Sequence, residues 1–453
     1  MGKKKDVITK IDLGKTNKEI ERAIGDITRD AYIFYGGYVN NFRAITNVND
    51  GNKISYRRLI YAAMQYPKGK LIPSLTLISS ISQWHPHGTA NLNGVNAALV
   101  NSGIFSGRGF FGSTSMSLDG GVVSEPSNER YLQSRLSDLY WKLLEDPIKE
   151  VPMVESPQGA MEPAYIPLPF PMCLSMVSPI QGLGVATRAI YPIFTERSLY
   201  EAYKANNPKL LKSKIDLLID YDNSELERLW KTGKGKVIYS YKISRTTSPD
   251  GKTEGILFEG DTSMFAPNFK KFKQLSLEGK VYGEDVSDIN GEKYFIGRVP
   301  GARGITIEDI EGIARKCCYD DTTYNLMVTD QNTCFRIPMY DRLDYTYKNY
   351  INLITRVNQR KIEKTTFDIA VYESLPIISD YILNKNPMAT DEEISKALNL
   401  HPDVVSAVMS KPISYIRKNK DSTERLSELK KRLKSYKSFD PEKYVEEVIN
   451  QFG

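Results

Sequence analysis

The 453-residue chain has few of the features that mark a disulfide scaffold, a zinc site or a membrane span. Its four cysteines are too few for a disulfide framework and predict a reducing compartment. None has zinc-site spacing, and the adjacent Cys317 and Cys318 are expected to alternate between core and surface. No apolar run approaches the roughly 18 residues of a membrane span. The basic N-terminus lacks the apolar stretch of a signal peptide. We therefore expect a cytoplasmic protein with no membrane partner.

The chain also lacks a strong charge of either sign. Lys and Arg total 61 against 55 for Asp and Glu, which gives a formal net charge of +6. This mild excess permits a polyanionic partner without requiring one. Histidine is scarcer still, with three in the chain, two of them in the segment His85–His87. Such a concentration of scarce titratable side chains indicates a site.

The length allows two or three domains. Residues 1–29 are expected to form a polar, partly helical arm. A helix is predicted from Ser55, acting as its cap, through Met64. A second helix is predicted after Gly88. Its inner face would carry Leu92, Val95 and Leu99, and its amide-rich outer surface Asn91, Asn93 and Asn96. Such a helix suits a nucleic-acid groove, although a merely solvated face is the alternative.

The rest of the chain changes character twice. Residues 150–195 are rich in proline and methionine and predict extended, turn-rich structure. From about 196 to 340, helices alternate with strands such as Lys236–Lys242, which predicts an α/β lobe. Two amphipathic helices follow, at 350–362 and from Asp421 or Ser422 through Leu433. With a small insert at about 375–415, they predict an antiparallel pair with a knob at its tip.

The chemistry centres on Arg130-Tyr131. A tyrosine that cleaves a phosphodiester must lose its proton, and fixed cations must meet the charge on the phosphate. Tyr131 would be the nucleophile and Arg130 the guanidinium beside it. The other candidates for phosphate contacts are Arg43, Lys53, Arg57, Arg58 and His87. An Arg-Tyr pair alone is commonplace, so the prediction depends on the whole set occurring within about a hundred residues.

These motifs resemble the breakage–reunion (A-type) subunit of type IIA DNA topoisomerases. The resemblance lies in Arg43–Met64, His85-Pro-His-Gly88, Gly107-Arg-Gly-Phe-Phe-Gly-Ser113 and Asn128–Leu136, in that order. Later signatures are Glu162–Pro171, Gly182-Leu-Gly-Val-Ala-Thr187 and Thr232-Gly-Lys-Gly-Lys-Val237. The resemblance covers about residues 25–440, is most specific over 43–136, and fades toward the C-terminus.

The resemblance implies an α+β multidomain fold. After the arm at 1–29 come a winged-helix DNA-cleavage domain at 30–160 and an α/β tower domain at 161–345. An antiparallel coiled coil with a helical dimer-gate knob occupies 346–453. Bacterial relatives add a β-propeller after the coiled coil, for which this chain has no room. It therefore most resembles the short medium subunit of tailed-phage topoisomerases, which would act in the host cytoplasm.

The resemblance also assigns roles to residues. Tyr131 is expected to be catalytic, assisted by Arg130, His87 and Arg43. DNA contacts are expected from Lys53, Arg57, Arg58, His85 and Asn91. Ile190 matches the residue that wedges between base pairs, with Tyr191 as the second candidate. Thr46-Asn47, Ile54 and Tyr56 depart from the family pattern. Glu129 adds a negative charge that opposes a phenolate unless it faces away.

The resemblance implies cofactors that this chain does not hold. Asp220-Tyr-Asp222 imitates a metal strand without a suitable glutamate, and Gly233–Lys236 lacks phosphate-loop spacing. Mg²⁺ and ATP are therefore expected to be bound by a partner subunit carrying the ATPase and metal-binding domains. Double-stranded DNA and a second copy of the chain are the other expected partners. An inactive DNA clamp of the same fold is the alternative function. A tyrosine recombinase would need its tyrosine near the C-terminus, whereas Tyr131 lies in the first third.

Overall fold

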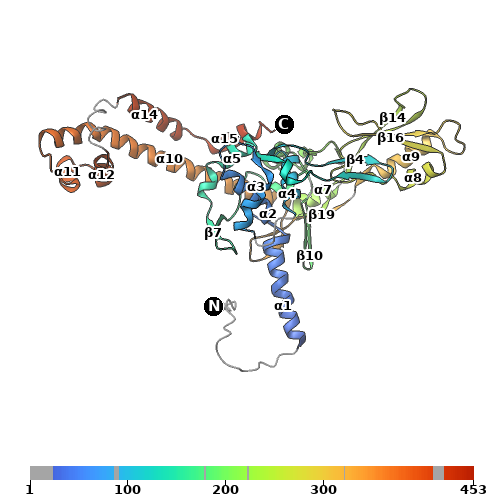
Figure 1. Ribbon diagram of the computed structural model, residues 1–453, viewed down its shortest axis with the longest axis horizontal. Helices are drawn as coiled ribbons and strands as arrows, with labels where there is room; N and C mark the ends of the chain where they lie inside the picture. The colour runs from blue at the N-terminus through green and yellow to red at the C-terminus, as the bar shows by residue number, and fades with distance from the viewer. Residues whose placement is uncertain are drawn as a thin grey trace.

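The computed structural model is an elongated α+β structure with three projections from a central body (Figure 1). It describes residues 24–85, 91–177, 180–221, 224–320, 322–411 and 423–452. The projections are helix α1 (Ile24–Val39), a sheet-rich lobe built around β14 (Lys242–Thr247), and the long helix α10 (Met339–Asn384). No helix in these described ranges is long and apolar enough to cross a membrane.

The body begins with short helices around a small sheet. Strands β2 (Ile72–Pro73), β6 (Gln133–Leu136) and β3 (Phe105–Arg108) form the sheet in that order. The other elements of this part of the chain are η1 (Asn40–Ala44), α2 (Ile54–Met64), α3 (Ser74–Ser80), η2 (Ile81–Gln83), α4 (Leu92–Asn101), the hairpin β4–β5 (Ser113–Ser117, Gly120–Ser124), η3 (Glu129–Tyr131), α5 (Asp138–Leu144) and η4 (Pro147–Glu150).

Helix α2 confirms the helix predicted near 55–64, but its start is one residue earlier. Lys53 is the extended N-cap residue, and the structure records no side-chain cap there. The predicted capping role of Ser55 is therefore wrong, because Ser55 already lies inside the helix. Leu59 and Ile60 are fully buried on the inner face, as the helical spacing predicts.

Helix α4 confirms the second predicted helix, with Leu92 and Leu99 buried. Its amide surface is not as predicted. Asn96 is fully buried, donates to Ser74 Oγ (3.0 Å) and accepts from Ser134 Oγ (2.9 Å). The prediction failed because a buried amide with two hydroxyl partners has the same sequence periodicity as an exposed one.

The second half of the body consists of hairpins and a mixed set of short elements. A four-stranded sheet has the order β12 (Lys234–Lys236), β19 (Thr323–Asn325), β10 (Thr187–Ile190) and β9 (Gln181–Gly184). The parallel pair β1 (Thr46–Asn47) and β20 (Met327–Thr329), continued by β21 (Cys334–Arg336), joins distant parts of the chain. The remaining elements are β7 (Met153–Glu155), β8 (Met161–Pro163), η5 (Met172–Leu174), α6 (Glu196–Ala205), η6 (Pro208–Leu210), β11 (Leu218–Ile219), α7 (Ser224–Thr232), β13 (Tyr239–Ser240) and β18 (Tyr319–Asp320).

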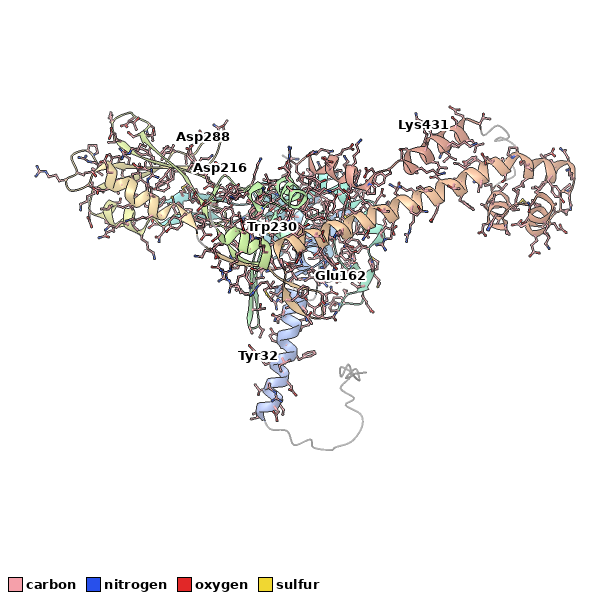
Figure 2. The ribbon with its side chains drawn as sticks, turned by 180° about the vertical axis from the view of Figure 1, so that it is seen from behind. Tyr32, Glu162, Asp216, Trp230, Asp288 and Lys431 are labelled. Carbon is pink, nitrogen blue, oxygen red and sulfur yellow. The ribbon has the colours of Figure 1, made fainter. Side chains whose placement is uncertain are left out.

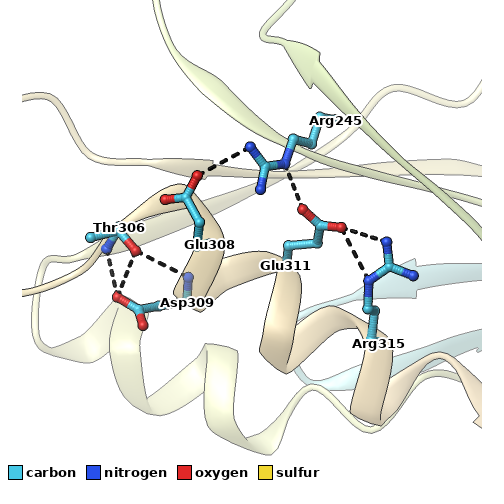
Figure 3. Close-up of polar contacts among 6 residues, drawn as sticks. All are labelled: Arg245, Thr306, Glu308, Asp309, Glu311 and Arg315. Carbon is cyan, nitrogen blue, oxygen red and sulfur yellow. Dashed lines mark hydrogen bonds and ion pairs between the residues drawn. The ribbon is translucent and has the colours of Figure 1, made fainter.

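The outer lobe is a four-stranded antiparallel sheet covered by two helices. Its strand order is β14, β15 (Glu254–Glu259), β17 (Lys293–Arg298) and β16 (Val281–Asp285), with α8 (Lys270–Leu277) and α9 (Ile307–Cys317) against it. Figure 3 shows how α9 is held. Arg245 of β14 reaches Glu308 and Glu311, and Thr306 forms a capping box with Asp309.

The adjacent cysteines at the end of α9 correct a third expectation. Cys317 and Cys318 are both buried rather than alternating between core and surface. The chain turns there from helix to strand, so the alternation of a continuous strand does not apply. Burial raises the pKa of the Cys317 thiol to about 12, which suits a core residue and not a reactive one.

The C-terminal part is a long helical arm. α10 spans 46 residues, and α14 (Thr423–Lys437) runs back along it (Figure 1), so the two predicted helices are confirmed as helical and longer than expected. At the far end, α11 (Asp391–Leu398) and α12 (Pro402–Met409) pack on α10 around a separate apolar core. Helix α15 (Pro441–Ile449) returns to the body, where Phe452 packs edge-on against Tyr140 and Phe170.

Candidate nucleic-acid interface

Tyr131 is displayed on the surface of the body. It ends the short helix η3, and its side chain is 73% exposed. The guanidinium carbon of Arg130 lies 5.9 Å from the centre of the Tyr131 ring. The Asn128 side chain accepts hydrogen bonds from Arg130 N (3.2 Å) and Nε (3.0 Å), which fixes the arginine beside the tyrosine. Asn128 lies in the motif Asn128–Leu136 but has no role of its own in the sequence-based prediction, although asparagine is a preferred helix N-cap.

Gly107 and Gly109 let the loop at 107–112 fold tightly and pack closely against Tyr131 and Leu132. Gly109 has φ +120°, and a Cβ there would lie 2.6 Å from Leu132 Cδ2 and 3.3 Å from the Tyr131 carbonyl oxygen. A Cβ at Gly107 would lie 2.4 Å from the Phe111 ring. Only glycine fits these positions without displacement, so this loop and the segment after Tyr131 pack as one unit. The Leu132 carbonyl also accepts from Ser74 N (2.9 Å) at the start of α3.

A cavity of about 530 Å³ gathers several of the predicted phosphate contacts. Arg43, Lys53, His85 and Asn91 line it, together with Gln181 of strand β9 and apolar side chains. None of the described residues that line it carries a carboxylate, so its fixed charge is positive. Among the described residues, Tyr131 and Arg130 do not line this cavity, and His87 lies outside the described part of the chain.

Arg43 owes its position to an irregular helix. It lies in η1, a π-helix in which Ile45 N donates to the Asn40 carbonyl (3.3 Å). Such wide turns are rare and often mark functional sites. The side chain of Asn40 holds the neighbouring hairpin, since its Nδ2 donates to the Val185 carbonyl (3.0 Å) and its Oδ1 accepts from Val185 N (2.7 Å).

Lys53 is the second cation of the cavity. Its Nζ donates to the Gln181 carbonyl at 2.5 Å, so it connects the start of α2 to the β9–β10 hairpin. Burial lowers the pKa of the Lys53 ammonium. An anionic ligand would favour the charged form, since it would supply the opposite charge that the cavity lacks.

Arg57 and Arg58 do not face solvent. Arg57 Nε pairs with Asp50 Oδ2 (3.1 Å), and Arg58 reaches both oxygens of Glu162, at 2.7 and 2.6 Å. The two arginine side chains are 4% and 2% exposed. A direct contact with phosphate, which is the role expected of both residues, would require these ion pairs to open. Buried guanidinium groups need such carboxylate partners, and the sequence reasoning missed both.

The predicted wedge residue is also buried. Ile190 is 5% exposed and Tyr191 only 1%, and the Tyr191 hydroxyl bonds to Thr46 Oγ1 (2.7 Å). Neither side chain can enter a base stack from there. The exposed apolar residue of the same hairpin is Leu183, at 72% exposure, opposite Arg188 across the β9–β10 pair. An apolar residue between two glycines at a hairpin end is the sequence signal that could have identified it.

Metal-ligating side chains do not gather in this site. In the ranges that the structure describes, no group of three or more His, Cys, Asp or Glu side chains is placed to hold a metal ion. Asp222, half of the Asp220-Tyr-Asp222 motif, lies outside those ranges. The described donors therefore do not form a metal centre.

Comparisons with known proteins find similarity to DNA topoisomerase subunits. Residues 43–250 match the family of the DNA gyrase/topoisomerase IV A subunit. The chain is 24% identical over 296 residues to the A subunit of DNA topoisomerase 4 from Streptococcus pneumoniae, covering 59% of this chain and 35% of the relative. It is 25% identical over 305 residues to the A subunit of DNA gyrase from Nocardioides sp., covering 59% and 32%.

The resemblance to type IIA A-type subunits is therefore confirmed, at low identity: residues 43–250 match the DNA gyrase/topoisomerase IV A-subunit family, and about 59% of the chain aligns with curated A subunits. It spans about a third of the length of these curated relatives.

Proposed function

We propose that this chain is the DNA-cleavage and religation subunit of a type II DNA topoisomerase. The observation that carries the proposal is the exposed Tyr131, with the Arg130 guanidinium held beside it by Asn128. In this proposal Tyr131 Oη bonds to a DNA phosphorus as the P–O3′ bond breaks, which leaves a 5′-phosphotyrosine. The phenol loses its proton, the departing 3′ oxygen gains one, and religation reverses both steps.

Arg130 would meet the charge that develops on the phosphate, with His87 and Arg43 completing the site. Lys53, His85 and Asn91 would bind the flanking backbone, since they share the positive cavity with Arg43. Arg57 and Arg58 are buried, so they would not touch DNA themselves but would position the residues that do. Leu183 replaces Ile190 as the proposed wedge, because it is the exposed apolar side chain of the hairpin.

The larger assignments belong to the same proposal. Residues 30–160 would be the winged-helix domain, 161–345 the tower, and 346–453 the coiled coil and dimer gate. Double-strand cleavage needs two tyrosines, so the chain would act as a two-fold dimer. A partner subunit would supply the ATPase and the metal ion. That ion would stabilise the leaving 3′ oxygen.

Trapping the covalent intermediate tests the proposal. Plasmid DNA is incubated with the chain and its ATPase and metal-binding partner, then denatured, and protein-linked DNA is mapped by mass spectrometry. We expect an adduct on Tyr131 that Tyr131→Phe abolishes, with DNA binding nearly unchanged because one hydroxyl is removed. Tyr319→Phe is the control, since Tyr319 is also exposed but lies on a different element, strand β18. An adduct on another tyrosine overturns the assignment.

A further inference from the structure

A buried chain of polar side chains connects the interior of the body to the positive cavity. Glu162 of β8 is 4% exposed, and its two oxygens accept from Arg58 Nε and Nη2 at 2.7 and 2.6 Å. The remaining amino group, Nη1, lies 3.1 Å from His85 Nδ1. His85 lines the cavity with Arg43 and Lys53. Figure 2 labels Glu162 within the body, close to the base of α1.

The hydrogen bond between Arg58 and His85 determines which ring nitrogen of His85 carries a hydrogen. A guanidinium carries only donors and is always protonated, so in the contact with His85 it must donate. The imidazole Nδ1 must then be the acceptor, without a hydrogen of its own. Protonating Nδ1 would set two positively charged donors against each other. A neutral imidazole that accepts at Nδ1 carries its hydrogen on Nε2.

Glu162 makes this arrangement rigid. Its two hydrogen bonds hold the planar guanidinium in one orientation, and a carboxylate–arginine pair with two parallel bonds is geometrically specific. Among the described residues, Arg58 contacts the His85 ring and pairs with Glu162 behind it, and Arg43 and Lys53 line the same cavity as His85. Three of these four are cations, which also disfavours an imidazolium.

We infer that Glu162 and Arg58 are positioning residues that fix His85 as the neutral Nε2–H tautomer, so that His85 donates a hydrogen bond to a phosphate oxygen in the cavity. The inference rests on the proposed function for the identity of the anion, a DNA phosphate. It assigns to Glu162, more than a hundred residues from Arg58 along the chain, a part in DNA recognition that it plays without touching DNA.

Nitrogen NMR of the full chain with labelled histidine tests the tautomer. The chain has three histidines, so the signal lost in His85→Gln identifies His85. We expect an unprotonated Nδ1 and a protonated Nε2 in the wild type at neutral pH, and a mixture of tautomers in Glu162→Gln. Asp138→Asn is the matched control, because Asp138 also makes two bonds to an arginine, Arg135, but at the surface. The control should leave the His85 spectrum unchanged.

Binding to a short DNA duplex tests the donor role. Glutamine can place an amide N–H near the position of Nε2, whereas leucine cannot donate. We expect His85→Leu to lose about tenfold in affinity, as for a hydrogen bond to a charged group, and His85→Gln to recover most of it. A protonated Nδ1 in the wild type, or equal affinities of the two variants, overturns the inference.

These measurements involve no cleavage, so they are separate from the Tyr131 adduct. Should Glu162→Gln fail to fold, the wild-type spectrum alone still decides the tautomer.

Discussion

Glu292 is a carboxylate that the fold makes harder to ionise. It accepts from Thr262 Oγ1 (2.6 Å) and Thr262 N (3.2 Å) in the outer lobe, and from Thr114 Oγ1 (3.0 Å) on the β4–β5 hairpin. Burial is the main cause that raises the pKa of Glu292, and the nearby Asp261 raises it further. The Glu292 side chain thus joins the body to the lobe, and its carboxyl group is harder to deprotonate there than in water.

This raised pKa predicts a pH-dependent stability. The folded protein holds the Glu292 proton more tightly than the unfolded chain. Its contribution is therefore fully present below the ordinary glutamate pKa and is lost as the pH rises through the raised value. Glu292→Gln removes the titration and keeps an acceptor oxygen. We expect the melting temperature of the variant, relative to wild type, to increase across that window, measured by thermal scans from about pH 4 upward.

Glu254→Gln is the control for this prediction, because Glu254 is an exposed carboxylate on strand β15 of the outer lobe. A difference between Glu292→Gln and wild type that stays constant with pH would contradict the assignment.

The two adjacent arginines show what sequence can and cannot indicate at this scale. Arg57-Arg58 has the sequence of a basic surface pair, because the carboxylate that pairs with Arg58 lies 104 residues away along the chain. Nothing local to the pair indicates Glu162. Tyr131 and Arg130, in contrast, are adjacent in sequence, so their proximity could be predicted. The role of each remains a proposal.

At the scale of the element, the two strands of the β9–β10 hairpin carry residues with different roles. Leu183 on β9 is the proposed DNA contact, and Ile190 on β10 is a core residue. Leu183→Ala removes an exposed apolar tip, so we expect weaker DNA bending with little change in stability or affinity, since phosphate contacts dominate affinity. Ile190→Ala is the matched variant on the partner strand. Because Ile190 is buried, it should lower the free energy of unfolding by about 2–5 kcal/mol.

Energy transfer between fluorophores at the two ends of a DNA duplex measures the bending, and chemical denaturation measures the stability. Equal bending by Leu183→Ala and wild type would remove the hairpin tip from the proposed wedge.

Elements with strong periodicity were the predictable ones. Helices α2, α4, α10 and α14 all lie where apolar spacing placed them, although α10 extends well beyond 350–362. Their ends were less predictable, because a helix continues wherever tertiary packing stabilises it. The predicted strand Lys236–Lys242 is divided among β12, β13 and β14, which belong to three different sheets. Local sequence composition does not indicate that consecutive short segments will pair with strands of different sheets.

At the scale of the whole molecule, the arm predicts a dimer. Its far end carries the exposed apolar side chains Met388 (91%) and Ile377 (52%) beside the separate core of α11 and α12. We expect a two-fold dimer at micromolar concentration, and Met388→Asp should shift it toward monomer, since a charge is costly in an apolar contact. Light scattering after size-exclusion chromatography gives the mass directly.

Ile289→Asp is the control for the dimer, because Ile289 is fully exposed between strands β16 and β17 of the outer lobe. This lobe projects from the body on the side opposite the arm (Figure 1). A chain that stays monomeric, both by itself and with its partner, would contradict the proposed gate.

The order of body, lobe and arm along the chain could be expected from composition and from the family resemblance. The direction in which each projects could not, because it depends on long-range pairs such as β1 with β20. Domain boundaries stay predictions.

Because α10 is long, a small rotation near its base moves its far end by a large distance. Arg360 and Lys361 tie it to the body through ion pairs with Glu150 and Asp146, at 2.9 and 2.6 Å. Beyond Lys361 the helix continues to Asn384, a length of about 35 Å at 1.5 Å per residue. A tilt of about 10° at these ion pairs therefore displaces the far end of the helix by roughly 6 Å. Motions too small to break either ion pair would therefore displace the far end by several ångströms, which would be enough to separate the two arms of the proposed dimer.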